Sequence, residues 1–526
     1  MGYNQQGDSV SFAPMVNLAK DDHAILVYAS QQKQNDQETA DDLTISPSEY
    51  DKQLYGLNYQ YQLNNGQVGF AIHSTDTSQA GTPALPMDVD YIEANRFEFN
   101  GEHDWFNHEI VWSLSYLDAE HGMDNYALRH NMNENMYRYN TAAATSTNLK
   151  FHASKLYAFG RLTYGLDGYW SEHDSTITSP KNRMFNILNF NSVKDNRYGV
   201  FAEYDKAYSS GTWSFGLRLK QHQQDADDVD HHMAMMNDNI KMLKNNFNNA
   251  DKNDTKSLHD IAINWHHDLK DNLQISVGLG QKQRAASYQE LYLWLPMQST
   301  GGLADGRTYV GDINLEPETA NQLNLGLTWK GKSFQISPNL FYQKIDDYIQ
   351  AFPSTNMAAN MVANMMTGKM PLQFANVEAE LTGFDLDLTA QLSEFWSLDM
   401  IASYVKGERG DINDNLYRVS PANLNATINY QQENWQLRLN WHLFAKQDDV
   451  SVINDEKPTS GYGLINVSGR YTWSNVQIHA GIRNLMDKNY IDHLAGTNRV
   501  MMSDIPTGNK LPGVGRDVYA ALVYSF

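Results

Sequence analysis

The chain ends with residues 515–526, GRDVYAALVYSF. As a strand, this stretch places five residues on one face: Val518, Ala520, Leu522, Tyr524 and the terminal Phe526. An apolar strand edge of this kind promotes aggregation in water. It suits the closing strand of a transmembrane β-barrel, whose apolar face contacts lipid and whose aromatic side chains lie at the interface. The alternative is an edge strand of a soluble sheet, which the rest of the chain disfavours.

The same alternation of apolar and polar residues recurs along the whole chain. Apolar faces of predicted strands are Leu57/Tyr59/Tyr61/Leu63, Leu162/Tyr164/Leu166/Trp170, Ile275/Val277/Leu279, Leu323/Leu325/Leu327/Trp329, Leu437/Leu439/Trp441/Leu443 and Val476/Ile478/Ala480/Ile482. The opposite faces carry Asn, Gln, His, Lys, Arg and Ser. This period of two is typical of a sheet that is wetted on one side only.

The connections between these strands alternate between short and long. Tight turns are predicted at 64–66, 209–211, 270–271, 330–332, 432–434 and 474–475. Long polar loops are predicted at about 35–52, 76–90, 118–145, 174–195, 225–253, 285–318, 348–373, 408–420, 448–460 and 488–513. Strict alternation puts every long loop on one side, as in outer-membrane barrels, whereas a soluble sandwich has no reason to sort its loops in this way. The sequence therefore predicts an all-β, transmembrane antiparallel β-barrel with about 21 strands.

Composition agrees with that fold and excludes several other classes. The 526 residues include 30 Tyr, 20 Phe and 11 Trp, yet only 41% are hydrophobic, and no window approaches the roughly 20 apolar residues of a membrane helix. The formal charge of -22 argues against a nucleic-acid partner. The absence of Cys excludes a disulfide scaffold or a thiolate metal site within the chain.

The strand count carries an expectation about the first strand. A single-chain bacterial barrel normally has an even number of strands. The first predicted strand, 8–18, runs inward, so we expect one outward strand to precede Met1.

Two motifs in the second half resemble the barrel of TonB-dependent receptors. Residues 481–490, GIRNLMDKNY, resemble the family's "NLFDK.Y" signature, with Met486 where Phe is usual, and residues 315–319, LEPET, resemble its "L.PE.s" segment. The resemblance implies a 22-stranded barrel in the bacterial outer membrane, with lipid around it and a plug domain through which TonB drives import. Residues 1–526 would then be the barrel domain alone, and we expect the plug and the first strand to lie outside this sequence.

Four further segments resemble the copper receptor subfamily. They are 85–90 (LPMDVD), 121–129 (HGMDNYALR), 288–296 (YQELYLWLP) and 487–499, which contains His493 and Leu494. The resemblance implies that copper is the transported ligand. It also implies that a barrel His-x-Met pair, matched here by His121 and Met123, holds copper together with a Cys and a Met of the plug. Those two plug ligands have no counterpart in this sequence.

The residues themselves support a soft-metal hypothesis. Methionine occurs 21 times and clusters in the predicted external loops, where thioether sulfur would favour Cu(I) and imidazole would accept either copper state. The densest run supplies the remaining candidate ligands, which are His231, His232, Met233, Met235 and Met236. The alternative interpretation is packing. The run 357–370 has the spacing of a short amphipathic helix, with Met on its buried face.

No other chemistry is indicated. The acidic runs 225–230 and 411–414 could hold Ca²⁺, but such runs are more often solvated loop tips. No nucleophile elbow, zincin motif or phosphate loop occurs in a supporting context, so no enzyme is predicted. The sequence predicts the barrel of a copper-importing receptor, and the alternatives left open are a passive porin, a metal-binding surface protein anchored by a barrel, and a nonfunctional receptor fragment.

Overall fold

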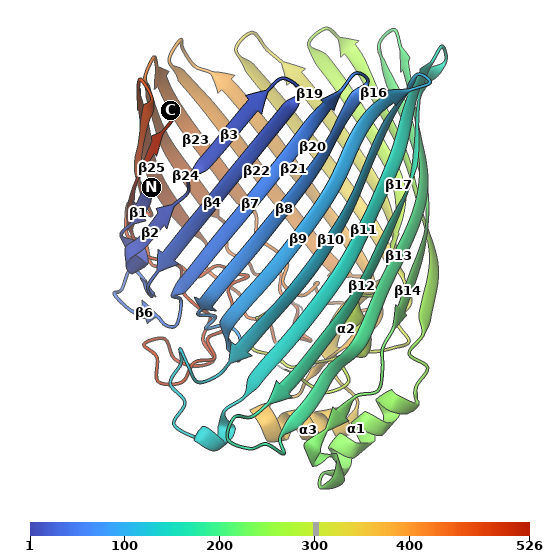
Figure 1. The fold of residues 1–526 in the computed structure, drawn as a ribbon, viewed down its shortest axis with the longest axis vertical. Helices are drawn as coiled ribbons and strands as arrows, with labels where there is room; N and C mark the ends of the chain where they lie inside the picture. The colour runs from blue at the N-terminus through green and yellow to red at the C-terminus, as the bar shows by residue number, and fades with distance from the viewer. Residues whose placement is uncertain (298–303) are drawn as a thin grey trace.

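The computed structural model describes residues 1–297 and 304–526, and its main feature is one closed antiparallel sheet (Figure 1). The first wall strands are β1 (Gly2–Asn4), β2 (Ser9–Phe12), β3 (Met15–Lys20), β4 (His23–Gln34), β7 (Tyr50–Leu63), β8 (Gly66–Ala80), β9 (Asp88–Trp105), β10 (His108–Asp124), β11 (Tyr139–Tyr157), β12 (Gly160–Thr178), β13 (Asn186–Tyr208) and β14 (Gly211–Asp225). The wall continues with β16 (Asp254–Lys270), β17 (Leu273–Arg284), β19 (Glu318–Lys330), β20 (Phe334–Pro353), β21 (Leu372–Gln391), β22 (Trp396–Arg409), β23 (Asn423–Gln432), β24 (Trp435–Phe444), β25 (Tyr462–Trp473), β26 (Val476–Arg483) and β27 (Asp517–Tyr524).

The sheet contains 25 strand segments. When two short segments are left out and one interrupted strand is counted once, the wall has 22 strands. The segments β15 (Asp230–His231) and β18 (Tyr309–Val310) are two-residue additions at the mouth of the barrel. The segments β2 and β3 form one wall strand that is interrupted at Ala13 and Pro14. The predicted fold class is therefore confirmed.

Closure of the wall depends on the short strand β1. It pairs Gly2 with Ala521 of β27 on one side and with Ser11 of β2 on the other. The predicted 21 strands correspond to the wall from β2/β3 to β27, and β1 occupies the position next to them where we expected a further outward strand.

The predicted apolar faces match across the sheet. In β27, Leu522 pairs with Ile478 and Val518 pairs with Ile482, so the closing strand and its neighbour present one continuous apolar surface. Phe526 is 89% exposed, as expected of an aromatic side chain that contacts the membrane interface. None of the helices among the described residues has the length and apolarity to cross a bilayer.

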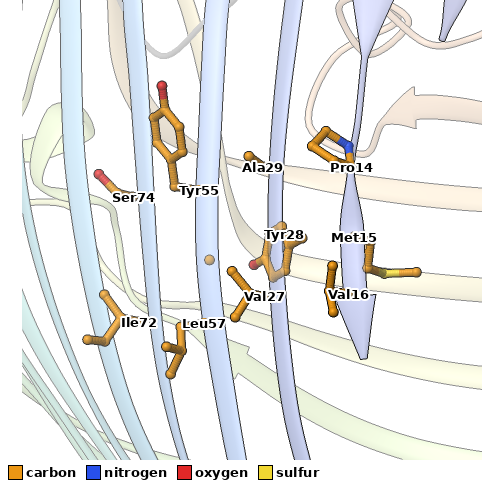
Figure 2. Close-up of a pocket in the computed structure, with 11 residues that line it drawn as sticks. Pro14, Met15, Val16, Val27, Tyr28, Ala29, Tyr55, Leu57, Ile72 and Ser74 are labelled. Atoms are coloured by element: carbon orange, nitrogen blue, oxygen red, sulfur yellow. The ribbon is translucent and has the colours of Figure 1, made fainter. Parts of the chain in front are cut away.

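Figure 2 shows a shallow depression on this apolar surface, formed by β3, β4, β7 and β8. Val27, Leu57 and Ile72 lie side by side in register, and the small Ala29 lies between Pro14 and Tyr55. Its lining is almost wholly apolar. Because it belongs to the lipid-facing row of side chains, we interpret this depression as part of the membrane surface rather than as a ligand site.

All six predicted tight turns lie between consecutive strands, at one end of the barrel. The long loops lie at the other end, together with the helices α1 (Asp238–Asn249), α2 (Tyr288–Tyr292) and α3 (Met357–Thr367) (Figure 1). Three short 3-10 helices, η1 (Gln6–Asp8), η2 (Glu134–Met136) and η3 (His232–Met235), and a small sheet of β5 (Gln37–Glu38) and β6 (Thr44–Ile45) complete the fold. In outer-membrane barrels the long loops are external, so the helices lie at the outer mouth.

Several loops are shorter than predicted, because the strands continue beyond the membrane. The predicted loop 174–195 is the clearest case: β12 extends to Thr178, and β13 begins at Asn186. The extensions carry apolar side chains that pack inward, since Ile177, Ile187 and Val193 are buried in the core at the outer mouth. Packing against the loops, rather than contact with lipid, therefore keeps these strand ends in an extended conformation.

That core holds most of the buried apolar side chains of the described residues. It joins β13, α1, the segment around Leu291–Leu295, and α3. The helix predicted over 357–370 is present, but the expectation that Met forms its buried face is wrong. The buried residues are Ala358, Ala359, Val362 and Ala363, whereas Met361 is 57% exposed. The face of the helix that carries Met and the face that carries Ala and Val are both apolar. The smaller Ala and Val side chains allow a closer approach to the core.

The two faces of a wall strand give a direct test of the membrane assignment. Leu325 lies on the apolar face of β19, and Asn324 on the polar face. We expect Leu325→Arg to destabilise the barrel by about 2–4 kcal/mol because it places a charge in lipid. Asn324→Arg is the matched control and should cost far less. Urea unfolding in lipid vesicles measures both, and equal costs would contradict the assignment.

Candidate functional site

The strand β10 carries the predicted His-x-Met pair beyond the membrane, on its lumen face. Leu114 and Tyr116 belong to the apolar face, so Ala119, His121 and Met123 point the opposite way. All three line one cavity of about 890 Å³ beneath the loop core. Among the described residues, the imidazole of His121 has no hydrogen-bond partner, so either ring nitrogen is available to a ligand.

We call this space the methionine cavity because eight of the 21 methionines line it. They are Met87, Met123, Met136, Met233, Met297, Met365, Met366 and Met501, and three histidines, His121, His173 and His231, line it with them. Its charged lining residues are Arg138 and Asp174. A cavity rich in thioether and imidazole, with one carboxylate, suits a soft metal ion and not a hard one.

Of the seven residues predicted from sequence, the cavity brings four together: His121, Met123, His231 and Met233. The other three are elsewhere. Met235 is 96% exposed at the loop surface, and Met236 is also exposed. The ring of His232 packs against that of Phe185 in a tilted arrangement with centroids 4.3 Å apart, and its Nδ1 atom is buried without a hydrogen-bond partner among the described residues. For these three residues, metal binding stays a prediction.

The local role of His231 is that of a helix cap. Its Nδ1 atom accepts a hydrogen bond of 3.0 Å from the backbone N–H of Met233, at the start of η3. Burial first, and the neighbouring His232 second, lower the pKa of His231 to about 4, so the ring is neutral at ordinary pH. Because Nδ1 is the acceptor, the neutral ring carries its proton on Nε2. His231 is consequently a poorer metal ligand, as it stands, than His121.

Two segments quoted for the copper receptor resemblance are held together by a buried ion pair. Arg129 donates to Asp88 through Nε at 2.7 Å and through Nη2 at 2.6 Å, and both side chains are buried. The same guanidinium donates to the carbonyl oxygens of Leu85 and Thr82. This pair fixes the loop that presents Met87 to the cavity.

Sequence reasoning missed His173, Met87 and the Asp88–Arg129 pair. His173 could have been found from the alternation of side chains along β12. Leu166 and Trp170 face lipid, so the odd-numbered residues of this strand, His173 among them, face the lumen. Its ring stacks on Tyr288, with centroids 4.7 Å apart. No sequence pattern pairs Asp88 with Arg129, because the two lie 41 residues apart.

Residues 1–297 and 304–526 contain no group of three or more His, Asp or Glu side chains placed to hold a metal ion. The cavity differs from such centres in its sulfur content. Thioether ligands are neutral and weak individually, and they select soft ions by number and geometry.

The comparison with known families settles the class of protein. The profile of the TonB dependent receptor-like β-barrel family matches residues 35–485. The chain belongs to this family. Its members are receptors and transporters of the bacterial outer membrane that act with TonB. No curated protein sequence matches this receptor barrel.

The solved structures similar to this receptor barrel are described by different ligands. The copper transporter OprC matches with a TM-score of 0.84 at 18% identity, over 100% of this chain and 79% of OprC. The iron transporter FrpB of Neisseria meningitidis matches with 0.72 at 13% identity, over 100% and 80%. The siderophore receptor PirA of Acinetobacter baumannii matches with 0.69 at 13% identity, over 100% and 80%. At these identities the likeness shows the shared fold and leaves the ligand undecided.

The capping role of His231 can be tested by two substitutions. Asn also accepts a hydrogen bond at a helix N-cap, so His231→Asn should leave the loop intact. His231→Ala should destabilise the loop locally by about 1 kcal/mol because the Met233 N–H loses its acceptor. Limited proteolysis of the loop 226–250 measures both. Equal protection in the two variants would contradict the role.

The Asp88–Arg129 pair should be essential to the loop that carries Met87. Arg129→Met leaves a buried carboxylate without its partner, and we expect a cost of about 3–5 kcal/mol. The control is Lys181→Gln, which breaks the exposed Lys181–Glu134 pair and should cost less than about 1 kcal/mol. Hydrogen exchange of residues 82–90 should become faster in Arg129→Met and stay unchanged in Lys181→Gln. An unchanged exchange rate in Arg129→Met would show that the pair does not hold the loop.

Proposed function

We propose that this receptor barrel takes up copper, which it receives in the methionine cavity. The observation that carries the proposal is the lining itself: eight methionines and three histidines converge on one space at the outer mouth, with one carboxylate among them. Iron in its ferric form prefers anionic oxygen ligands, and Asp174 is the one carboxylate among the described lining residues. The cavity chemistry therefore favours copper, above all Cu(I), over the iron ligands of other family members.

The path of the ion follows from the positions of the methionines. Met357, Met361 and Met370 are exposed on and just after α3, and Met365 and Met366 of the same segment line the cavity. An ion captured at the surface of α3 can pass between thioethers without meeting a strong ligand, because each Met binds weakly. His121 and Met123 then offer an imidazole and a thioether from the rigid wall strand β10.

Import past this site would require energy, which TonB supplies to members of the family. The barrel residues proposed here bind and orient the ion, and they carry out no redox step. The resemblance to copper receptors seen in the sequence and the similarity to OprC both agree with this proposal.

The proposal is tested by metal titration of the purified barrel in detergent. We expect saturable binding of Cu(I), or of Ag(I) as its redox-inert substitute, to weaken at least tenfold in a variant combining His121→Ala with Met123→Leu. A matched control combines His479→Gln with Met486→Leu, which removes one His and one Met outside the cavity and should leave affinity unchanged. Full affinity in the first variant would exclude His121 and Met123 as ligands. Saturable binding of a ferric siderophore, with none of Cu(I) or Ag(I), would overturn the copper assignment.

A further inference from the structure

A second large cavity lies among the external loops and is lined by cations. Its volume is about 920 Å³, and it is formed by parts of the loops that precede β19, β21, β23, β25 and β27. The basic side chains that line it are Arg307, Lys369, Arg418, Lys457, Lys488 and Lys510. Three acidic side chains line it with them, in a protein whose net charge is -22. We call it the basic cavity.

The carboxylate of Asp305 is already engaged by hydroxyl groups. Asp305 accepts hydrogen bonds from the hydroxyl groups of Tyr309, at 2.5 Å, and of Tyr417, at 2.8 Å. Both tyrosine pKa values are raised, first by burial and next by Asp305. The two hydroxyl groups therefore stay protonated and hold this carboxylate in place.

The other two carboxylates are engaged as well. Glu456 accepts hydrogen bonds from Nε2 of the buried His493, at 3.1 Å, and from the backbone N–H groups of Arg418 and Ser451. Asp455 forms an ion pair with Lys457. Among the described residues, Lys369 and Lys488 have no ion-pair partner and are exposed. The cavity therefore has a surplus of unneutralised positive charge.

One wall of the basic cavity contains buried polar atoms that lack partners. Asn454 is 1% exposed, and neither its Nδ2 nor its Oδ1 atom forms a hydrogen bond with any described residue. The buried Nε atom of Arg307 is unpaired in the same way. The two residues are adjacent, since Nη1 of Arg307 donates to the carbonyl oxygen of Asn454 at 3.0 Å. A buried group of this kind lowers stability unless a ligand or water satisfies it.

We propose that the basic cavity binds a small polyanion with carboxylate or phosphate groups. Anionic oxygens accept hydrogen bonds from Nε of Arg307 and Nδ2 of Asn454, and Lys369 and Lys488 neutralise the outer part of the ligand. The Oδ1 atom of Asn454 is an acceptor, so it requires a donor on the ligand. A hydroxycarboxylate or a hydrogen phosphate supplies both kinds of group. This site shares no lining residue with the methionine cavity and does not depend on the copper proposal.

Calorimetric titration of the full chain in detergent with citrate and with inorganic phosphate tests the site. We expect saturable binding at low ionic strength that weakens as salt is added. Asn454→Leu should weaken binding at least tenfold. It should leave the unfolding midpoint unchanged or higher, because it removes two unpaired polar atoms from a buried position.

A second variant does not disturb the buried wall. Lys369→Gln with Lys488→Gln should weaken binding at least fivefold, since both side chains are exposed and their loss leaves the packing intact. The matched control, Lys241→Gln with Lys332→Gln, removes two exposed lysines outside the cavity and should have no effect. Loss of affinity to the same extent in the control, or no saturable binding of either probe, overturns the proposal.

Two further arms identify the source of the anion. Citrate alone and its copper(II) complex present the same carboxylates, so tighter binding of one of them distinguishes a free anion from an anionic metal chelate. The variant combining His121→Ala with Met123→Leu should bind citrate as the wild type does. Failure of the copper proposal would thus leave this result unchanged.

Discussion

Closure of the backbone hydrogen bonds around the wall is the constraint on which the rest of the structure depends. Hydrocarbon offers no partner to a free N–H or C=O group, so the strands of a sheet in a bilayer pair with their neighbours. Among the described strands of the wall, β3 pairs with β4 alone, and the others pair on both sides. The ring is completed by β1, three residues that pair with β27 and β2. The N- and C-terminal segments therefore lie side by side in the wall, and every loop is held at a fixed position on a rigid cylinder.

The site follows from the extension of that cylinder beyond the membrane. Strands such as β12 and β13 are longer than a bilayer requires, and their outer ends pack against a dry core formed by the loops. The ends of β10 and β12 consequently hold His121 and His173 in rigid sheet rather than in flexible loop. Apart from Met123 on β10, the methionines of the cavity come from the loops above. A rigid floor of imidazole beneath a more adaptable roof of thioether is suited to an ion that must be held and then released.

The outer mouth separates two kinds of ligand chemistry. The methionine cavity contains few charges and many polarizable atoms, whereas the basic cavity contains surplus cations and unpaired hydrogen-bonding groups. The loop between β26 and β27 contributes to both, through Met501 to the first and Lys510 to the second. Soft metal ions and anionic oxygens do not compete for such groups, so the two cavities can be occupied independently.

The wall could be predicted closely from local pattern. Alternation of period two, six tight turns and the terminal aromatic residue specify a closed antiparallel sheet, because each is a property of neighbouring residues. The outer strand ends were harder to predict: the loop core, and not lipid, keeps residues such as Ile177 and Ile187 in extended conformation.

The sequence alone determined that the chain forms a barrel in a membrane and that sulfur and imidazole gather at its outer end. Only the tertiary structure decided which of these residues meet. It placed Met233 in the cavity and Met235 on the surface, two residues apart in one run. It also packed the alanines of α3, and not its methionines, into the loop core, which the pattern could not predict because Met and Ala are both apolar. Contacts between distant loops, such as Asp88 with Arg129, depend on the closed cylinder that brings those loops together, and no local pattern encodes them.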